Sequence, residues 1–377
     1  MNIPGSDNLP AGIRSRVIGQ VNGLSMHVLE AGFEDPTRPC IVLLHGFPEL
    51  AYSWRKTMGP LASAGYYVVA PDQRGYGWTT GWLDDYETDL APFRFPNLVR
   101  DVLGLLWALG RSSAECIVGH DFGSPVAGFA ALIRPDVFKS AVMMSAPFPG
   151  APPVPVPGAT APDTASLNAA LARLEPPRKH YQHYYSSREA NDNMWHCPQG
   201  VHDFLRAYYH HKSADWPGNQ PFPLQSVAAE EFAKLPSYYV MALDKGMAET
   251  VAAEMPTAGE VENCSWLTDH ELAVYSEAYT RTGFQGALNW YRCLSDPAAI
   301  AEMRLFAGRT LDVPSMFVAG AQDWGIYQMP GALEQMQTRA CTQMTHCHFV
   351  EGAGHWVQQE QAPEVTARLL EFLGRDQ

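Results

Sequence analysis

The sequence has little of what marks secreted or membrane-embedded proteins. Its 377 residues include only seven cysteines, an odd number without Cys-x-x-Cys spacing, which is more typical of a reducing compartment than of a disulfide framework. The first ten residues contain no basic segment followed by an apolar one, so no signal peptide is evident. No apolar run has the length of a transmembrane helix. These absences predict a cytoplasmic protein that does not span a membrane.

Positive charge is also scarce. Lys and Arg number 26 against 40 Asp and Glu, which gives a formal net charge of −14. An acidic surface without a basic run repels nucleic acid and anionic membranes, so we expect neither as a partner. Hydrophobic residues make up 46% of the chain, enough for a large core. The expected partner is a small molecule, and a homodimer is compatible with the sequence.

Short apolar runs alternate with helix-length segments through much of the chain. The first part reads as a hairpin, because residues 16–20 and 24–30 flank Asn22 and Gly23, a dipeptide suited to a tight turn. Continuous apolar runs then indicate strands buried on both faces. Alternation of such strands with helices predicts an α/β fold with a mainly parallel sheet. The expected strands are Cys40–Leu44, Tyr67–Ala70, Cys116–Val118, Ala141–Met144, Pro314–Val318 and His348–Val350, and the expected helices include Phe95–Leu109, Ser124–Leu132, Pro330–Thr338 and Pro363–Leu373.

The alternation stops at a proline-rich stretch, Pro147–Pro157, which is incompatible with a central strand or a helix. The segment that follows is rich in aromatics and histidine and has helical but no strand periodicity. The sequence therefore predicts a core in two parts, residues 1–146 and 298–377, interrupted by a helical cap at residues 147–297.

The segment Gly119–Gly123 reads Gly-His-Asp-Phe-Gly and joins an apolar strand to a helix of small residues. Small residues two positions on either side of a polar one are typical of the nucleophile elbow, whose centre is strained and whose flanks have no room for a Cβ. The chain contains no Gly-x-Ser-x-Gly, so the candidate nucleophile is Asp121 rather than a serine. The alternative is an Asp121 that caps the following helix.

The loop His45–Glu49 directly follows the first buried strand. In such folds this loop supplies one backbone N–H to the nucleophile turn, and the residue after the nucleophile supplies a second. Phe47 and Phe122 are therefore the predicted oxyanion donors, although an ordinary Gly-Pro loop is an alternative for the first. We also expect His45 and Pro48 to help bind the substrate.

A second loop, Gly352–Trp356, follows the last predicted strand. Its His355 can serve as a general base, and Asp323, just past the preceding strand, can orient the imidazole. The chain order nucleophile, acid, base is that of α/β-hydrolases. Trp356 is expected to contribute to the substrate pocket.

Three histidine pairs invite a metal interpretation, but none has a third ligand at convincing spacing. We therefore expect neither a metal nor an organic cofactor. The pairs are His180 with His183, His210 with His211, and His346 with His348.

Taken together, these motifs resemble the epoxide hydrolase branch of the α/β-hydrolase fold, over nearly the whole chain from Arg16 to Leu373. His45–Pro48 looks like that family's HGxP motif, in which the bond before proline is typically cis. Pro71–Gly77 looks like its next loop, and Gly119–Gly123 matches its nucleophile motif. Thr282–Arg292, which ends in Asn-Trp-Tyr-Arg, closely resembles a segment of the family's cap.

The resemblance implies two catalytic tyrosines in the cap. One lies nine positions before the Phe of the Gly-Phe pair, which here is Tyr275, and the other matches Tyr181. Both phenols would hold the epoxide oxygen while Asp121 attacks a ring carbon and forms a covalent ester. Water activated by His355, with Asp323 behind it, would then release a vicinal diol.

Two other functions remain open at the level of sequence. A haloalkane or haloacid dehalogenase of this fold shares the Asp, the His and the ester, but it needs halide donors, often a Trp after the nucleophile, where this chain has Phe122. A non-catalytic ligand-binding protein on this fold is the other alternative. The intact set of Asp121, Asp323 and His355 favours an enzyme over a binding protein.

Overall fold

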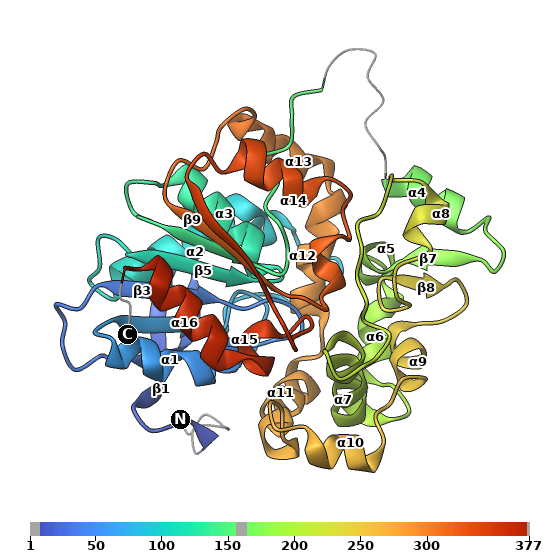
Figure 1. Cartoon of the computed structure of the whole chain (residues 1–377), viewed down its shortest axis with the longest axis horizontal. Coiled ribbons are helices and arrows are strands. Elements are labelled where there is room, and N and C mark those ends of the chain that lie inside the picture. The colour runs from blue at the N-terminus through green and yellow to red at the C-terminus, as the bar shows by residue number, and fades with distance from the viewer. Residues whose placement is uncertain (1–7, 156–163, 375–377) are drawn as a thin grey trace.

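An eight-stranded sheet forms the centre of the molecule (Figure 1). The structure is a computed structural model that describes residues 8–155 and 164–374. The strand order is β1-β2-β4-β3-β5-β6-β9-β10, in which β2 runs antiparallel to both of its neighbours and all later pairs are parallel. The strands are β1 (Ile13–Val21), β2 (Leu24–Ala31), β3 (Cys40–Leu44), β4 (Tyr67–Pro71), β5 (Cys116–His120), β6 (Ala141–Met144), β9 (Ser315–Gly320) and β10 (Met344–Val350).

Helices cover both faces of the sheet, which explains the unbroken apolar runs of its strands. In β3, Ile41 and Leu43 face the layer that contains α1 and α16, while Val42 and Leu44 face the layer that contains α2 and α3. This architecture confirms the predicted α/β-hydrolase fold class. The core helices are α1 (Arg55–Ser63), α2 (Phe95–Ala108), α3 (Gly123–Ile133), α13 (Pro297–Met303), α14 (Ala332–Gln335), α15 (Val357–Glu360) and α16 (Ala362–Phe372).

The chain leaves the sheet after β6 and returns at β9, and the segment between them packs beside the core, in green to orange in Figure 1. We call residues 147–297 the cap. Its helices are α4 (Thr164–Leu171), α5 (Tyr181–Tyr185), α6 (Glu189–Trp195), α7 (Gly200–Lys212), α8 (Ala229–Phe232), α9 (Met247–Ala252), α10 (Ala258–Asn263), α11 (Asp269–Thr282) and α12 (Gln285–Ser295).

The cap also contains strands, which corrects the expectation that it has none. β7 (Arg178–His180) pairs antiparallel with β8 (Val240–Ala242). Strands of three residues are too short to show an alternating pattern, and these two are far apart in sequence, so local periodicity misses them. Within the proline-rich stretch, residues 147–155 form neither helix nor strand, and residues 156 and 157 lie outside the described residues.

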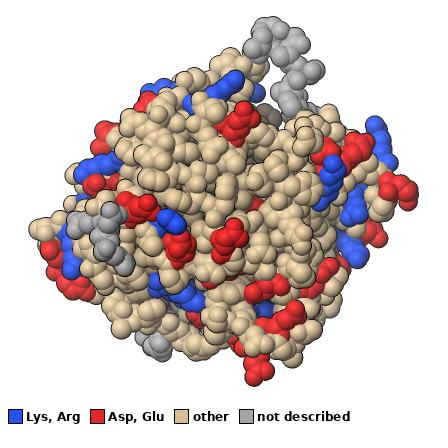
Figure 2. All heavy atoms as spheres, viewed as in Figure 1, with Lys and Arg blue, Asp and Glu red and all other residues tan. Residues whose placement is uncertain are grey.

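The distribution of charged side chains on the surface is consistent with the net negative charge of the chain. On the face shown in Figure 2, Lys and Arg side chains are scattered among Asp and Glu and do not gather into a basic patch. Within the described ranges, no helix is long and apolar enough to cross a membrane.

Candidate active site

Asp121 lies at the turn between β5 and α3, in a backbone conformation that few side chains adopt. Its φ is +51°, in the left-handed region. The glycines on either side make this turn sterically accessible. A Cβ on Gly119 would lie 2.0 Å from the carbonyl oxygen of Gly123, and a Cβ on Gly123 would lie 2.5 Å from that of Leu44. The turn therefore has the geometry of a nucleophile elbow with a carboxylate at its centre.

Two groups hold the Asp121 carboxylate from opposite sides. The backbone N–H of Phe47 donates to Oδ1 at 2.9 Å, and Nε2 of His355 lies 3.2 Å from Oδ2. The peptide bond between Phe47 and Pro48 is cis. The amide of Phe122 begins α3 and does not donate to the carboxylate, so of the two predicted oxyanion donors only Phe47 contacts it.

His355 lies between two carboxylates. Its Nδ1 is 3.1 Å from Oδ1 of Asp323, which also accepts from the N–H of Gly325 at 2.7 Å. Its Nε2 faces Asp121 but makes no well-aligned hydrogen bond with any described residue. Asp323 therefore fixes the orientation of the ring, and Nε2 is left to accept a proton from a water molecule.

The electrostatics of the pair favour an ionised nucleophile. Burial alone would raise the pKa of Asp121, but His355, and then Lys212 and His120, outweigh it and hold that pKa well below its usual range. Burial and Lys212 lower the pKa of His355, yet the carboxylates of Asp323 and Asp121 together raise it above its usual value. Asp121 is consequently charged at neutral pH.

A buried Glu49–His120 pair supports the catalytic groups. Nδ1 of His120 lies 2.6 Å from a carboxylate oxygen of Glu49, and Nε2 lies 2.7 Å from the backbone carbonyl of His355. The ring of His120 is therefore held from both sides, by the Glu49 carboxylate and by the backbone of the catalytic base. Burial raises the pKa of Glu49, but His120 and then His45 outweigh it and hold that pKa below its usual value, so Glu49 is ionised.

Asp121 opens onto a cavity of about 230 Å³ between the core and the cap. From the cap, Tyr181 and Tyr291 line it, and the Tyr181 hydroxyl donates to Oε1 of Gln328 at 2.9 Å. Burial and the nearby charge of Asp121 raise the pKa of Tyr181 well above its usual value, so the phenol keeps its proton. The other lining residues are mostly apolar: Phe95, Phe122, Pro125, Phe129, Ala146, Phe148, Pro149, Gly150, Gln182 and Leu294.

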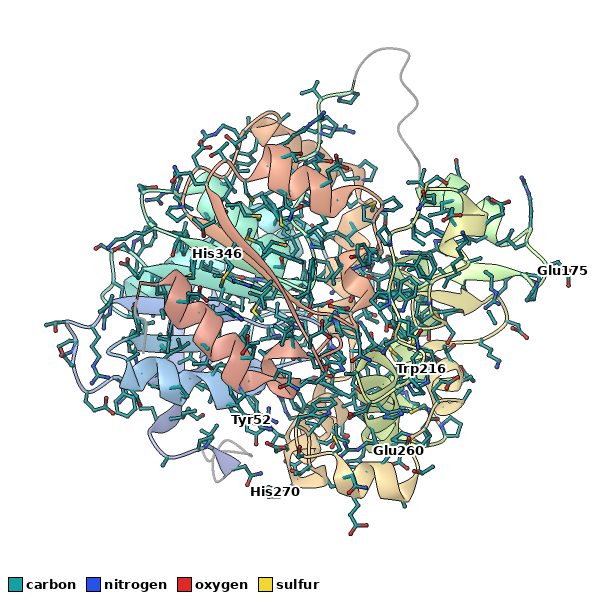
Figure 3. The ribbon with its side chains drawn as sticks, in the orientation of Figure 1. Tyr52, Glu175, Trp216, Glu260, His270 and His346 are labelled. Atoms are coloured by element: carbon teal, nitrogen blue, oxygen red, sulfur yellow. The ribbon has the colours of Figure 1, made fainter. Side chains whose placement is uncertain are left out.

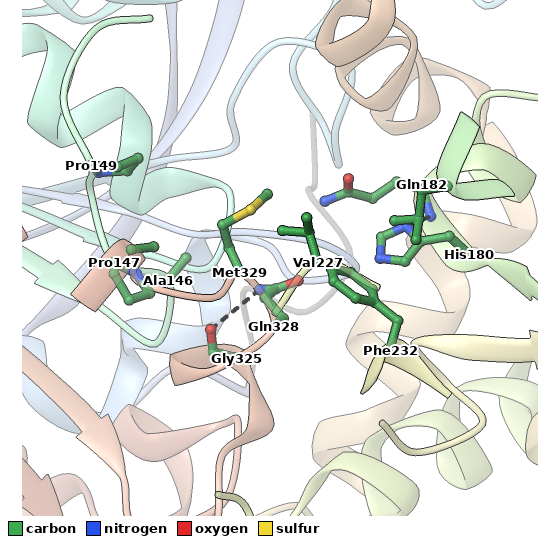
Figure 4. Close-up of a pocket in the computed structure, with 12 residues that line it drawn as sticks. Ala146, Pro147, Pro149, His180, Gln182, Val227, Phe232, Gly325, Gln328 and Met329 are labelled. Carbon is green, nitrogen blue, oxygen red and sulfur yellow. Dashed lines mark hydrogen bonds between the residues drawn. The ribbon is translucent and has the colours of Figure 1, made fainter. Parts of the chain in front are cut away.

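A second cavity, of about 430 Å³, adjoins the first (Figure 4). The two share Ala146, Pro149, Gln182 and Gln328 in their walls. In the close-up, His180, Gln182 and Phe232 of the cap lie on the side opposite to Ala146, Pro147 and Pro149, where the chain passes from the core into the cap. This larger chamber is predominantly apolar, and the side chains of Gln182 and Gln328 lie in the wall that it shares with the cavity of Asp121.

Tyr275 is buried elsewhere. Its hydroxyl donates to Oε1 of Gln359 at 3.1 Å, and its ring contacts Tyr52 and Tyr209. Figure 3 labels Tyr52 near the boundary between the core and α11. The structure thus brings Tyr181 to the cavity of Asp121 but does not bring Tyr275 there.

The three residues predicted to bind substrate have other contacts and do not line either cavity. Nε2 of His45 accepts from the N–H of Gln73 at 3.1 Å, so its Nδ1 donates to the carbonyl of Gly46. Pro48 accepts through its carbonyl from the Tyr209 hydroxyl at 3.2 Å. The indole of Trp356 donates to the carbonyl of Tyr209 at 2.8 Å. These residues hold the loops around the site.

Several residues of the site were not singled out from the sequence. His120 and Glu49 belong to the motifs but had no assigned role, although His120 ends β5 and Glu49 lies in the loop after β3, at the strand ends where functional groups gather. Tyr291 and Gln328 could be found only from the packing of the cap on the core. Lys212, at the end of a helix that contains three histidines, is expected from the sequence to be solvated.

No three His, Cys, Asp or Glu side chains within residues 8–155 and 164–374 gather in a way that could hold a metal ion. His346 and His348 stack on each other at 5.4 Å between ring centroids, on β10 and away from Asp121.

The sheet, the elbow and the Asp121–His355–Asp323 set define an α/β hydrolase with a carboxylate in the nucleophile position. Consistent with this, the chain matches the alpha/beta hydrolase fold family over residues 39–362. It is 33% identical to a protein named epoxide hydrolase A from Mycobacterium tuberculosis, over 93% of this chain and 95% of that protein. It is 30% identical to an epoxide hydrolase from Caballeronia sordidicola, over 93% of this chain and 91% of the relative.

Solved structures similar to this chain are also those of epoxide hydrolases. An epoxide hydrolase from an endophytic Streptomyces superposes with a TM-score of 0.76 at 28% identity, covering 97% of this chain and 96% of that one. Epoxide hydrolase A from Mycobacterium thermoresistibile superposes with a TM-score of 0.74 at 30% identity, covering 96% and 98%. The chain belongs to the epoxide hydrolase family of the α/β-hydrolase fold.

Proposed function

We propose that this enzyme opens an epoxide to a vicinal diol through a covalent ester on Asp121. The observation that carries the proposal is the Asp121 carboxylate itself. One of its oxygens is held by the Phe47 N–H, the other faces His355, and the group opens onto a cavity that a protonated Tyr181 also lines. A carboxylate nucleophile suits an alkylating substrate, because the resulting ester can be hydrolysed.

In the first step, Oδ2 of Asp121 attacks a ring carbon and forms a C–O bond. The opposite ring C–O bond breaks, and its electron pair stays on the epoxide oxygen. The Tyr181 hydroxyl donates to that oxygen and stabilises the developing charge. Oδ1, already held by the Phe47 N–H, becomes the carbonyl oxygen of the ester.

In the second step, His355 takes a proton from water and the hydroxide adds to the ester carbonyl carbon of Asp121. Asp323 stabilises the imidazolium that forms. The N–H groups of Phe47 and Phe122 hold the tetrahedral oxyanion, the second by a contact that forms only in this step. Collapse of the intermediate breaks the bond between the carbonyl carbon and the alkyl oxygen, which takes back the proton from the His355 imidazolium. The proton left on the new Asp121 carboxyl group passes to the alkoxide formed in the first step. The diol then leaves with an oxygen of the enzyme, and Asp121 and His355 return to their starting forms.

A second phenol would share the charge on the epoxide oxygen. Tyr291 is our candidate, because it lines the same cavity as Asp121 and Tyr181. The role that the resemblance implies for Tyr275 stays a prediction, since that residue does not line the cavity of Asp121.

The walls of the site favour an epoxide with apolar substituents over a haloalkane. Among the described residues that line the cavity of Asp121 there is neither a Trp nor an Arg that could bind a leaving halide. The adjoining chamber is lined mainly by apolar groups, so we propose that it takes a hydrophobic substituent of the epoxide.

The covalent scheme is tested by trapping the ester. His355→Gln removes the base but leaves Asp121 able to attack, so we expect intact-protein mass spectrometry after exposure to styrene oxide to show one added substrate mass. The double variant Asp121→Ala/His355→Gln should show no adduct, and Asp121→Ala alone should lose turnover. If His355→Gln gives neither an adduct nor a burst of substrate consumption, the covalent mechanism is wrong.

A further inference from the structure

A buried lysine lies beside the catalytic groups without an acidic partner in contact. Lys212, the last residue of α7, is only 3% exposed. Among the described residues, no carboxylate forms an ion pair with its ammonium group, whereas Asp121 and Asp323 both pair with His355. A buried ammonium is costly unless its surroundings compensate it, so its retention here requires an explanation.

Aromatic rings take the place of a counter-ion. The ammonium nitrogen lies 5.1 Å from the ring centroid of Tyr239, 5.4 Å from those of Tyr208 and Trp356, and 5.6 Å from that of Tyr238. Ring faces at this range attract a cation without neutralising it. The field of the charge therefore reaches the carboxylates nearby instead of being cancelled by a contact partner.

The end of α7 is fixed to the loop that carries the catalytic base. The backbone N–H of His355 donates to the carbonyl of Lys212 at 2.9 Å. One carboxylate oxygen of Glu360 accepts from the N–H groups of Ala214 and Gly354, at 2.8 and 2.9 Å. These bonds tie the cap to the His355 loop, so the distance between the lysine and the imidazole cannot vary freely.

The charges near His355 show what the lysine does. Asp121 and Asp323, the two carboxylates that pair with His355, place two negative charges around a neutral imidazole. The positive charge of Lys212 reduces the net charge around this imidazole to one negative charge. Without it, the imidazole would gain a proton more readily and would be unable to act as a base. The ester is the state in which the base acts; there Asp121 has lost its charge, and Lys212 balances Asp323 alone.

We propose that Lys212 is a positioning residue of the hydrolytic step, a fixed cation in an aromatic cage that keeps His355 in its neutral, basic form. This inference rests on the proposed function, because it concerns the base that hydrolyses the Asp121 ester. The lysine itself need not touch the substrate.

The other groups that face His355 and Lys212 act in known directions. Burial and then Lys212 lower the pKa of His355, while Asp323 and Asp121 raise it. Burial lowers the pKa of Lys212 itself, and the carboxylates of Asp121, Asp323 and Glu49 oppose that shift. Burial raises the pKa of Glu360 to about 8, so this carboxyl titrates at the alkaline side of the working range. Burial also raises the pKa values of the caging phenols, which therefore stay neutral; these are Tyr208, Tyr238 and Tyr239.

The test is the pH dependence of the two half-reactions, measured by rapid-quench single turnovers with styrene oxide between pH 5 and 9. In the native enzyme we expect ester hydrolysis to fall as pH decreases through the pKa of His355. In Lys212→Met, which keeps the length of the side chain without its charge, the midpoint of this fall should move to higher pH, on the order of one unit. Alkylation should keep its pH profile, because Asp121 stays ionised in both proteins.

Lys212→Arg keeps the charge and should retain the native midpoint even if its rates fall. Glu360 titrates in every variant, so a difference between the Met and Arg variants reports the charge at position 212. An unshifted midpoint in Lys212→Met, or the same shift in Lys212→Arg, would contradict the proposal and indicate a packing role.

A second measurement covers the case in which these variants fold poorly. Lys212→Ala leaves room in the cage, so added propylammonium should restore the native midpoint, whereas 1-propanol or sodium chloride at equal concentration should not. Equal effects of the amine and the alcohol would overturn the proposal. If the native enzyme neither turns over epoxides nor forms an ester, the proposed function fails instead, and that result is distinct from an unshifted midpoint in a working enzyme.

Discussion

Asp121 is held in a conformation that its neighbours impose. Four non-glycine residues among those described have positive φ, and Asp121 is the one that faces the cavity between core and cap. Asp tolerates this region better than most residues, and the strain is a recurrent feature of functional sites. The turn places the carboxylate beyond the end of β5, where His355 and the Phe47 N–H both reach it.

Substitution of single tyrosines gives the first prediction. Tyr181→Phe removes the phenol that lines the cavity and should slow alkylation by about 10²–10³-fold, because one donor to a developing alkoxide is lost. Tyr291→Phe should slow the same step, and Tyr275→Phe should slow it least, because Tyr275 does not line the cavity of Asp121. Stopped-flow measurement of the alkylation rate checks the order. A loss in Tyr275→Phe as large as in Tyr181→Phe would contradict this assignment and restore Tyr275 as the partner donor.

Sequence predicted the role of a residue where its immediate neighbours in the chain determine that role. Asp121 was identifiable because the glycines of the turn are adjacent to it in sequence. Tyr275 and Lys212 lie on helices whose rotation is set by packing against the core, so their positions do not follow from neighbouring residues. Nothing near Lys212 in sequence marks it as buried.

Among the elements, the strands were predicted closely and the cap was not. Burial on both faces makes β3 and β5 continuous apolar runs, and their predicted starts at Cys40 and Cys116 match the structure. The pairing of β7 with β8 joins two three-residue segments through long-range contacts, which no local pattern encodes.

The turn between β5 and α3 gives the second prediction. In Gly123→Ala the new methyl would meet backbone carbonyls of Leu44 and His45, at 2.5 and 2.7 Å, which cannot move aside separately. We expect a loss of about 1–3 kcal/mol or more in the free energy of unfolding and a loss of activity. Gly59→Ala, in α1 with nothing within 4 Å of its Cβ position, should be stabilising by up to about 1 kcal/mol. Urea unfolding curves test the pair, and equal stability of the two variants would contradict the account of the elbow.

Over the whole molecule, function depends on the contact between cap and core. Both cavities have walls from the two parts, and α7 is tied to the His355 loop. The sequence predicted an inserted cap, but neither the shape of the chamber nor the burial of Lys212 could be derived before the two parts were placed together.

The buried histidines predict how stability depends on pH. Burial lowers the pKa of His211 from its usual 6.5 to about 3, and neither ring nitrogen has a hydrogen-bond partner among the described residues. Below pH 6.5 the unfolded chain therefore binds more protons at this residue than the folded chain, so stability falls as pH falls. His211→Phe should remove this contribution, about 2 kcal/mol between pH 7 and pH 5. His196→Gln, at an exposed position, serves as the control.

Urea unfolding of the native and variant proteins at both pH values measures the difference. If the stability of His211→Phe falls between pH 7 and pH 5 as steeply as that of the native protein, His211 is not the buried neutral group described here.

The central claim, that the oxygen added to the substrate comes from Asp121, is tested most directly by a single turnover in ¹⁸O-labelled water with enzyme in excess over styrene oxide. We predict that the diol of the first turnover carries no label and that the label appears in the side chain of Asp121, since water attacks the ester carbonyl. Label in the first diol, with none in Asp121, would mean that water attacks the epoxide directly and that Asp121 is not the nucleophile.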